Sequence, residues 1–465
     1  MNSYKLLPFN FKKLDDKYLL VNDTGSFDFL DKREFDDLIN KKETGNKFIN
    51  KFAHKNKKEL NHFIEKYKDG KSYLDEGTIL FIMVLTNRCN QNCIYCQASK
   101  KNSFDKKYDM SQLTAKEAVD LIMQSPQKYI NIEFQGGEPL LNFEILKYIV
   151  LYIKKNEKKF DKKINFNIVS NLLTLNINHL KFFFENKVSI CTSLDGDKMV
   201  HEYNRPLMGG NSYDVLIDKI NLVKAEARRK KKRITINAIQ TTTRESLKYY
   251  KEIVDTYVKL EIKCIYIRPL NRFGLADKAF NSIGYSPYEY LDFYRNVLRY
   301  IIDINKKGTL LIEGTAQIFL QKIFQTKKIN HMEVRSPCGA TIGQIAINYN
   351  GEIFTCDEGR MLAESGDKSF KIGNVHNSLY KELYSNNVTK TVCMASCMEC
   401  SSRCYQCAYL PYCGICPIAN YVESGDIFKN SSYRCIVNEG LLDIIFKYLK
   451  EGDRKTLSIF NHWSN

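Results

Sequence analysis

Six apolar, strand-like runs alternate with helical stretches through the middle of the chain. Helical spacing of apolar residues is clear in segments such as "FEILKYIVLYIKK", which separate one run from the next. Strands that alternate with helices of this length are typical of β/α units arranged around a parallel sheet. The sequence therefore predicts an α/β fold with strands near residues 78–86, 130–135, 164–170, 188–194, 233–240 and 263–269.

The composition is that of a folded protein. The 465 residues are 44% hydrophobic and 12% aromatic, and this length is enough for about three domains. The longest apolar run, residues 78–86, is far shorter than the ~20 residues that span a bilayer. The N-terminus lacks the apolar core of a signal peptide, so we expect a cytoplasmic protein without a membrane partner. In that reducing compartment, fifteen cysteines indicate metal or cluster ligation rather than disulfides.

The net charge is +17, and lysines are spread along the whole chain. The run "RRKKKR" at residues 228–233 predicts an exposed helix end with a solvated, basic surface. The alternative is contact with an acidic partner, either a peptide or a nucleic acid. We expect the solvated surface, and therefore no nucleic-acid partner.

Three cysteines directly follow the first strand, in the C-x3-C-x2-C spacing of Cys89, Cys93 and Cys96. Three thiolates on one loop can hold three irons of a [4Fe–4S] cluster and leave the fourth iron open for chemistry. A zinc site is the structural alternative, but it would need a fourth Cys or His close by, and none follows. With Tyr95 before the last cysteine, this segment resembles the signature of the radical S-adenosylmethionine enzymes.

That resemblance implies a partial (β/α)6 TIM-like barrel over residues 77–310 and two cofactors, a [4Fe–4S] cluster and S-adenosylmethionine. In the family, the open iron binds the amino and carboxylate groups of S-adenosylmethionine. An electron from an external donor of the flavodoxin or ferredoxin type then yields methionine and a 5′-deoxyadenosyl radical. This radical chemistry belongs to the cofactor, and the protein contributes binding, aim and exclusion of water.

Polar motifs at the ends of the later strands support the resemblance. "GGEP" matches the family turn that meets the methionine amino group, and "SLDG…H…R" from Ser193 to Arg205 matches the peptide-modifying branch. Barrels of this class display functional groups at the carboxyl ends of their strands. By resemblance and position, the expected cofactor-binding residues are Tyr95, Gly136, Gly137, Glu138, Pro139, Ser170, Asn171, Ser193, Arg205, Gln240 and Arg268.

The densest cysteine group lies in "CMASCMECSSRCYQCAYLPYCGIC", residues 393–416. With the cysteines on either side, its order resembles the SPASM extension of these enzymes, expected over residues 337–440, which carries two auxiliary [4Fe–4S] clusters. The resemblance assigns Cys338, Cys356 and Cys416 to the first cluster. Either Cys400 supplies the fourth ligand of this cluster, or its fourth iron is left open to bind substrate. To the second cluster it assigns Cys404, Cys407, Cys413 and Cys435.

Two features depart from the SPASM pattern. "CGIC" has two residues between its cysteines where the family usually has three. Cys393, Cys397 and Cys400 are in excess of the pattern, and a further cluster or a zinc site is an alternative role for them. Asp357 follows Cys356, where related protein-oxidising enzymes place a proton-accepting aspartate; the alternative is an aspartate that only stabilises a turn.

Residues 1–76 predict a small α+β domain with a hairpin around "NDTG" and two helices. A domain of this kind before the barrel resembles the winged-helix-like modules that bind leader peptides by adding a strand to a sheet edge. A structural cap on the barrel is the alternative. We further expect a bridging helical segment at 311–336 and a C-terminal helix or tail at 441–465.

The whole pattern, including "GQIAINYNGEIFTCDEGRMLA", resembles the His-Xaa-Ser system radical maturases. It implies a peptide maturase that takes hydrogen from a ribosomally made precursor peptide with a leader. The expected product is a carbon–carbon or thioether crosslink, and the expected partner is a paired second maturase. One alternative is an anaerobic sulfatase-maturing enzyme, which makes formylglycine. Another is a non-catalytic iron–sulfur or zinc protein that binds nucleic acid.

Overall fold

The computed structural model describes residues 4–42, 47–232, 236–325 and 331–465. The first residues of the predicted strand at 233–240, the end of the basic run at 228–233 and part of the bridging segment at 311–336 lie outside these ranges.

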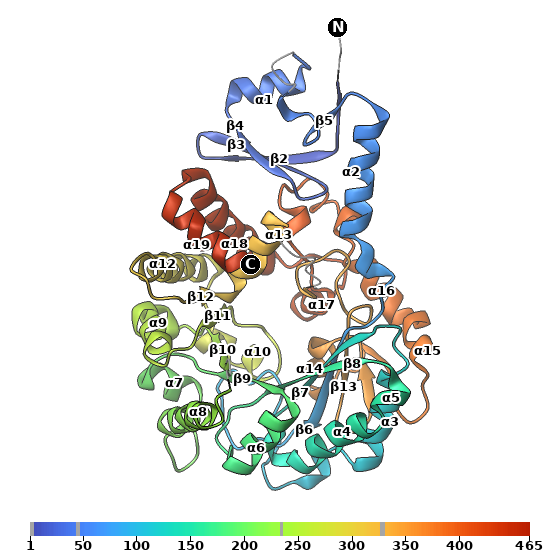
Figure 1. The fold of residues 1–465 in the computed structure, drawn as a ribbon, viewed down its shortest axis with the longest axis vertical. Helices are drawn as coiled ribbons and strands as arrows, with labels where there is room; N and C mark the ends of the chain where they lie inside the picture. The colour runs from blue at the N-terminus through green and yellow to red at the C-terminus, as the bar shows by residue number, and fades with distance from the viewer. Residues whose placement is uncertain (1–3, 43–46, 233–235, 326–330) are drawn as a thin grey trace.

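A ten-stranded, curved sheet forms the centre of the molecule (Figure 1). In spatial order its strands are β12 (Ile312–Glu313), β11 (Cys264–Arg268), β10 (Ile236–Thr241), β9 (Val188–Ser193), β8 (Lys163–Val169), β7 (Tyr129–Gly136), β6 (Leu80–Thr86), β13 (Gln344–Ile347), β14 (Glu352–Phe354) and β15 (Lys371–Asn374). All neighbours from β12 to β13 pair in parallel. The expected α/β partial barrel with six parallel units is therefore confirmed.

Helices cover the outer face of this sheet, as Figure 1 shows. The expected helix at 143–155 is found with those bounds. The helices of the barrel and its edge are α3 (Gln112–Ile122), α4 (Phe143–Lys155), α5 (Glu157–Phe160), α6 (Ile177–Asn186), α7 (Lys198–Asn204), α8 (Ser212–Arg229), α9 (Tyr250–Lys259), α10 (Leu275–Lys278), α11 (Phe280–Ile283) and α12 (Pro287–Lys306).

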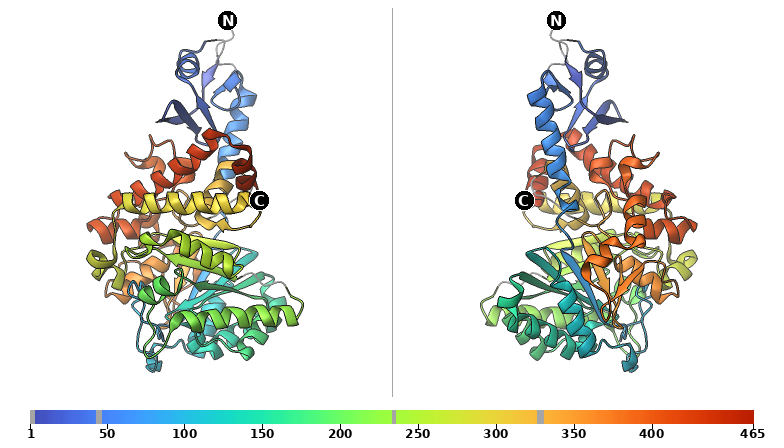
Figure 2. Two further views of the ribbon diagram at one scale, coloured as in Figure 1. Left: turned by 90° about the vertical axis from the view of Figure 1, so that its left-hand side faces the viewer. Right: turned by 90° about the vertical axis from the view of Figure 1, so that its right-hand side faces the viewer.

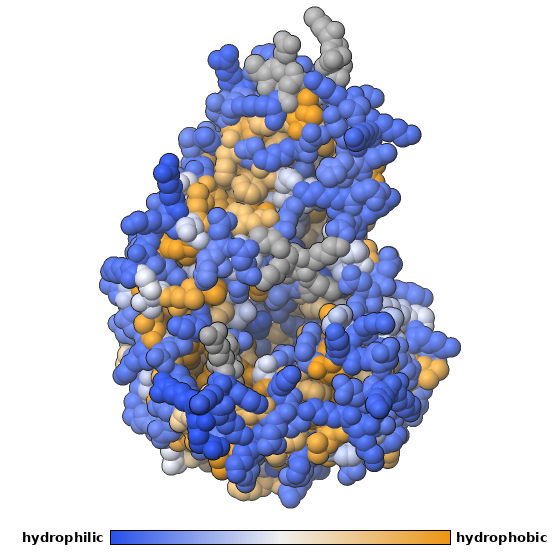
Figure 3. Space-filling model, viewed as in Figure 1, coloured by the Kyte–Doolittle hydropathy of each residue, from blue (hydrophilic) through white to orange (hydrophobic). Residues whose placement is uncertain are grey.

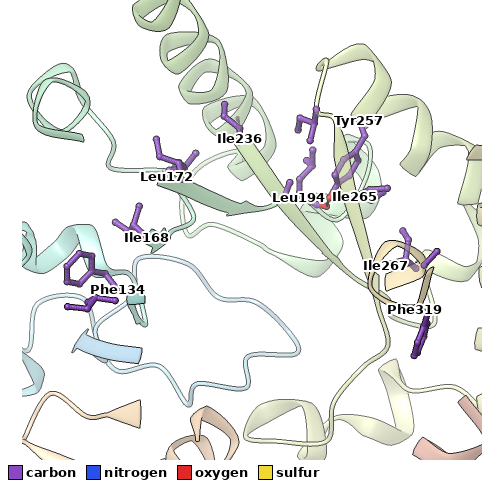
Figure 4. Close-up of a cluster of buried hydrophobic side chains, with 14 of the residues drawn as sticks. Phe134, Ile168, Leu172, Leu194, Ile236, Tyr257, Ile265, Ile267 and Phe319 are labelled. Carbon is purple, nitrogen blue, oxygen red and sulfur yellow. Dashed lines mark hydrogen bonds between the residues drawn. The ribbon is translucent and has the colours of Figure 1, made fainter. Parts of the chain in front are cut away.

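Apolar and polar side chains alternate along the strands, and this separates the core from the interior of the barrel. Ile168, Ile236 and Ile267 are buried beneath the outer helices, and Tyr257 of α9 lies beside Leu194 and Ile265 (Figure 4). The side chains between them on the same strands face inward and are largely polar, because successive residues of a strand point to opposite faces. The barrel interior is therefore lined by hydrogen-bonding groups.

The C-terminal region joins the barrel through its sheet. The predicted hairpin around Asn350–Gly351 is present as β13 and β14, and Gly351 takes the positive φ of 82° that the turn requires. β13 also pairs in parallel with β6, and its residues Ile345, Ala346 and Ile347 are buried. The remaining helices are α13 (Gly314–Phe324), α14 (Asp357–Glu364), α15 (Tyr380–Ser385), α16 (Asn387–Ala395), α17 (Pro417–Ser424), α18 (Ser432–Glu451) and α19 (Arg454–Ser464).

Two small sheets and two helices make up the N-terminal part, at the top of the molecule in Figures 1 and 2. The larger, three-stranded sheet β2-β3-β4 is called the N-terminal sheet, and β1 pairs with β5 in the other. The predicted hairpin is found, with Gly25 at a positive φ of 78° between β3 and β4. This part has its own apolar core around Leu20, Leu38 and Phe52. Its elements are β1 (Lys5–Leu6), β2 (Phe9–Leu14), β3 (Lys17–Asn22), β4 (Phe27–Leu30), α1 (Lys32–Ile39), β5 (Ala53–His54) and α2 (Lys57–Gly70).

The N-terminal sheet is docked on the C-terminal region. Lys12 of β2 forms ion pairs with Glu439 and Asp443 of α18, at 2.7 and 2.8 Å. Asn10 donates to the backbone carbonyls of Tyr405 and Cys407, at 2.8 and 3.2 Å. These contacts tie the sheet to the cysteine-rich loop.

No helix in the described ranges is long and apolar enough to cross a membrane.

A buried carboxylate closes the β11–β12 edge of the sheet. Glu313 is fully buried and accepts hydrogen bonds from the Tyr294 hydroxyl and from the backbone N–H groups of Ile267, Thr315 and Ala316. The last two bonds cap α13, and the bond to Ile267 holds β11 next to Arg268.

We predict that Glu313→Ala lowers the free energy of unfolding by at least about 3 kcal/mol, because each unsatisfied buried donor costs about 1–3 kcal/mol. Urea denaturation followed by circular dichroism measures the loss. Glu289→Ala is the matched control, since Glu289 caps α12 on the exposed surface and should shift the midpoint far less. Equal shifts for the two variants would contradict this role for Glu313.

Candidate functional site

The loop after β6 carries Cys89, Cys93 and Cys96 and is fixed from both sides. On one side the N–H of Cys89 donates to the carbonyl of Lys101, at 3.2 Å. On the other side the N–H of Ile94 donates to the carbonyl of Asn204, at 3.0 Å. The three thiols therefore sit on backbone that two separate segments hold in place.

Arg88, the residue before the first cysteine, ties this loop to its surroundings. Its guanidinium binds both carboxylate oxygens of Asp109 at 2.7 Å and donates to the carbonyls of Ser103 and Leu141 at 2.7 Å. A bidentate pair of this kind fixes orientation as well as charge. The sequence analysis missed Arg88, and no motif marked it.

The "SLDG…H…R" segment forms a buried network behind the second cysteine. Asp195 is fully buried and accepts hydrogen bonds from the Tyr95 hydroxyl at 2.5 Å and from Arg205 Nε at 3.1 Å. Arg205 Nη1 lies 3.7 Å from the sulfur of Cys93. Burial raises the pKa of the Cys93 thiol to about 11, and Arg205 acts against this rise. Arg205 therefore favours the thiolate that a metal would bind.

The "GGEP" turn requires its glycines because it packs against the cluster loop. A Cβ on Gly136, where φ is +145°, would lie 2.0 Å from the carbonyl oxygen of Thr86. A Cβ on Gly137 would lie 2.3 Å from the carbonyl oxygen of Arg88. The turn can approach the cysteine loop this closely only without side chains.

Glu138 links this turn to the end of β8. It is fully buried, and its carboxylate accepts from Ser170 Oγ at 2.7 Å and from the N–H groups of Leu140 and Asn171 at 3.0 and 2.8 Å. Burial raises its pKa to about 7, while these three donors act in the opposite direction. Glu138 holds Ser170 and Asn171 in place, and the Asn171 amide lies 3.9 Å from the Cys89 sulfur.

A cavity of about 220 Å³ opens beside the three cysteines, inside the barrel. Glu138, Pro139 and Gln240 do not contribute to its described lining. Gln240 is fully buried on the outer face of β10, whereas its neighbours Ile239 and Thr241 face the cavity. The expected cofactor-binding residues that do line it are Tyr95, Gly136, Gly137, Ser170, Asn171, Ser193, Arg205 and Arg268.

A second cavity of about 140 Å³ adjoins the first. The two share Arg268, Pro269 and Asn271 in their walls. Arg268 forms an ion pair with Glu333, at 3.5 Å, and Arg434 of α18 lies further along the wall. Figure 3 shows a recess near the middle of the face in view. The polar chamber thus runs from the cysteine loop towards the C-terminal cysteines.

The C-terminal cysteines form the two expected spatial groups. In the first, Cys338 and Cys356 belong to one buried apolar cluster, and Cys416 packs against it and lines the second cavity. Close approach explains the glycine of "CGIC", because a Cβ on Gly414 would lie 2.2 Å from the carbonyl oxygen of Glu333.

The second group lies between the "CYQCAYLPYC" loop and α18. The thiol of Cys407 has Cys404 and Cys435 as charged neighbours, and that of Cys413 has Cys407 and Cys404. Amide groups point at two of the sulfurs: Asn430 lies 3.5 Å from Cys404, and Asn438 lies 3.6 Å from Cys413. Hydrogen bonds to sulfur tune the reduction potential of iron–sulfur clusters.

The three surplus cysteines belong to the segment next to Cys338, whose N–H donates to Ser396 Oγ at 3.0 Å. Cys400 is exposed, and its sulfur is 3.6 Å from that of Cys397. Cys393 lies near the Arg335 guanidinium. In the part of the chain that the structure describes, no three His, Cys, Asp or Glu side chains converge closely enough to bind a single metal ion. A [4Fe–4S] cluster is larger than one ion, and its thiols stand correspondingly further apart.

Asp357 is engaged by a buried arginine. Its carboxylate accepts from Arg360 Nε at 3.0 Å and Nη2 at 2.6 Å, and Arg360 is fully buried. The next residue, Glu358, lines the second cavity instead. The sequence alone does not show that, of these two neighbouring carboxylates, one is paired with an arginine and the other lines a cavity.

Comparison with known proteins places this geometry in a class. Residues 83–236 match the model of the radical SAM superfamily. The radical SAM cyclopropyl synthase TigE of Paramaledivibacter caminithermalis is 23% identical over 455 residues, covering 93% of this chain and 86% of that protein. The cysteine-type anaerobic sulfatase-maturating enzyme of Clostridium novyi is 21% identical over 339 residues, covering 72% of this chain and 86% of that protein.

Among solved structures, that of SuiB from Streptococcus suis bound to precursor peptide SuiA superposes with a TM-score of 0.55 and 13% identity. This match covers 92% of the present chain and all of SuiB. The chain thus contains a radical SAM domain, and over most of its length it is similar to radical SAM enzymes, among them the cyclopropyl synthase TigE and a sulfatase-maturating enzyme. Its cofactors are [4Fe–4S] and S-adenosylmethionine, and the donor set described above fits them: three thiols on one loop, N–H groups near their sulfurs, and an adjoining polar cavity.

The raised pKa of Glu138 makes a testable prediction about stability. Between pH of about 4.5 and 7 the folded protein holds a proton on Glu138 that the unfolded chain releases, so this group's contribution to stability falls as pH rises. Across this range, the difference in unfolding free energy between wild type and Glu138→Gln should change by about 3 kcal/mol.

Urea denaturation of the apoprotein at a series of pH values measures this change. Glu157→Gln, on the exposed surface of α5, is the control and should follow the wild-type profile. A Glu138→Gln profile parallel to that of wild type would show that the carboxyl group is ionised throughout.

Proposed function

We propose that this protein is a peptide maturase that oxidatively modifies a ribosomally synthesised precursor peptide. The observation that carries the proposal is the N-terminal sheet docked beside the cysteine-rich loop. In sequence, the match to TigE covers 93% of this chain and that to the sulfatase-maturating enzyme 72%; in structure, SuiB covers 92% and the anSMEcpe structure with bound AdoMet 82%. The relatives whose matches span nearly all of this chain are thus a cyclopropyl synthase and an enzyme solved with a precursor peptide.

In this proposal Cys89, Cys93 and Cys96 hold the catalytic cluster. When bound, the cluster and S-adenosylmethionine supply a 5′-deoxyadenosyl radical, which removes hydrogen from carbon. Gly136 and Gly137 leave room for S-adenosylmethionine next to the cysteine loop. Pro139 begins the short helical turn after the two glycines. Gln240 is buried on the outer face of the strand that carries Thr241, so both residues support the wall of the cavity without lining it.

The second cavity is the proposed place of the substrate segment. It adjoins the first cavity at Arg268, and its wall contains the Glu333 and Arg434 side chains, which can fix a peptide backbone by hydrogen bonds. Its far side approaches Cys416. A reactive substrate carbon held near Arg268 would thus lie between the proposed catalytic cluster and the first auxiliary cluster.

The C-terminal cysteines are the proposed ligands of two auxiliary [4Fe–4S] clusters. Cys338, Cys356 and Cys416 would hold the first. Cys404, Cys407, Cys413 and Cys435 would hold the second, with the Asn430 and Asn438 amides near two of their sulfurs. Such clusters are electron-transfer groups, which an oxidative crosslink, carbon–carbon or thioether, requires.

The N-terminal sheet is the proposed binding site for the leader of the precursor. Its strand order is β2-β3-β4, so β2 and β4 are edge strands, and a leader can add to such an edge through backbone hydrogen bonds. We also propose an external electron donor of the flavodoxin or ferredoxin type, a paired second maturase, and a cytoplasmic location where the thiols stay reduced.

Loss of one cluster thiol tests the catalytic assignment. After anaerobic reconstitution with iron and sulfide, wild type should convert S-adenosylmethionine to 5′-deoxyadenosine when a reductant is added. Cys93→Ala should abolish this product, because the third iron loses its ligand. Cys264→Ala, a cysteine on β11 outside the loop, is the control and should retain the product. Product formed at the wild-type rate by Cys93→Ala would refute the assignment.

Co-expression tests the substrate class. A short peptide encoded beside the gene should lose two hydrogens per crosslink when expressed with wild type, as measured by mass spectrometry. Its mass should stay unchanged with Cys93→Ala. An unchanged precursor, together with conversion of a cysteine to an aldehyde in a sulfatase-derived peptide, would instead support sulfatase maturation, the second candidate that the match to the Clostridium novyi enzyme favours.

A further inference from the structure

The first auxiliary group has three thiols, and a [4Fe–4S] cluster takes four protein ligands when it is fully held. Cys338 and Cys356 are buried, and Cys416 packs against them. The fourth cysteine suggested by the sequence, Cys400, is exposed and lies against Cys397. Another group beside Cys338, Cys356 and the half-buried Cys416 must therefore supply the missing ligand.

One carboxylate lies beside these three thiols. Glu358 is the second residue of α14, and Cys356 is the residue that begins that helix. Glu358 and Cys416 line the same cavity. The Glu358 carboxylate is a charged neighbour that acts on the thiols of Cys338, Cys356 and Cys416 alike.

The other carboxylates nearby have partners of their own. Asp357 is bound by Arg360, and Glu333 is paired with Arg268. Within the described ranges, no side chain of another residue donates a hydrogen bond to Glu358, and its charged neighbours are the Glu333 and Asp357 carboxylates and the Arg434 guanidinium. Glu358 is thus the carboxylate of this wall that is left to bind a metal.

The charge balance of the group also calls for a cation. Three thiols and a carboxylate that line one part of the fold repel one another when they are ionised. Buried groups of one sign are stable when they coordinate a metal. Iron accepts carboxylate oxygen as well as thiolate sulfur, so four such donors form a complete ligand set.

We propose that Glu358 is the fourth protein ligand of the first auxiliary cluster. This inference rests on the proposed function, because it presupposes that Cys338, Cys356 and Cys416 hold such a cluster. One iron of that cluster then carries an oxygen ligand, while every iron of the second cluster carries sulfur. Glu358 lines the second cavity, where the substrate is proposed to lie, so the iron that it would hold would be bound from that side.

The test uses the full chain with Cys89, Cys93 and Cys96 all changed to Ala, so that only the auxiliary sites can take up iron. After anaerobic reconstitution with 57Fe, Mössbauer spectra should contain one iron site with an oxygen ligand. Glu358→Cys should remove that site and keep the iron content. Glu358→Ala should lose one iron from the cluster and give the EPR signal of a [3Fe–4S] cluster after oxidation.

Two further variants make the outcome decisive. Glu333→Gln changes a carboxylate in the same cavity and should leave both spectra unchanged. Cys338→Ala should disrupt the first auxiliary cluster whatever the role of Glu358. If Cys338→Ala alters the spectra and Glu358→Ala and Glu358→Gln do not, the inference is wrong while the cluster stands. If none of these variants alters the spectra, the proposed cluster itself is wrong.

Discussion

The arrangement of the whole site depends on the parallel ladders that β6 forms on both of its edges. β6 pairs with β7 on one side and with β13 on the other, and Phe81 to Leu85 are buried. The cluster loop leaves the carboxyl end of β6. Cys338 and Cys356 flank the β13–β14 hairpin at the opposite end, where Gly343 receives a hydrogen bond from Ile79. The seven residues of β6, about 20 Å of extended chain, therefore keep the two cysteine groups apart.

α14 spans the distance between these two groups. It begins after Cys356, and its last residue, Glu364, pairs with Lys101 beside the cluster loop at 3.7 Å. Met361, in the same helix, lines the first cavity, and Glu358 lines the second. One short helix thus supplies a wall to both cavities. The helix is thus held at both ends, next to Cys356 and next to Lys101.

Periodicity made the strands and helices predictable from sequence, and motif spacing made the cysteine groups predictable. It was harder to predict which face of the sheet each polar side chain occupies. Gln240 follows Ile236 and Ala238 in a period of two and so lies on the outer face of β10, a signal that was available but not used. Glu138 and Asp357 sit at the expected positions, yet their partners Ser170 and Arg360 come from packing that no local pattern encodes. The partners of Arg88 likewise come from packing that no local pattern encodes.

The N-terminal sheet is bound to the part of the chain that carries the second cysteine group. The Asn10 amide on β2 bonds to the carbonyls of Tyr405 and Cys407, and Lys12 on the same strand pairs with α18, which carries Cys435. Phe27 and Phe29 of β4 pack edge-on against Phe446 of α18. Both edge strands therefore contact α18, and any peptide strand added to this sheet lies on a support that is continuous with the chamber wall at Arg434 and Asn438.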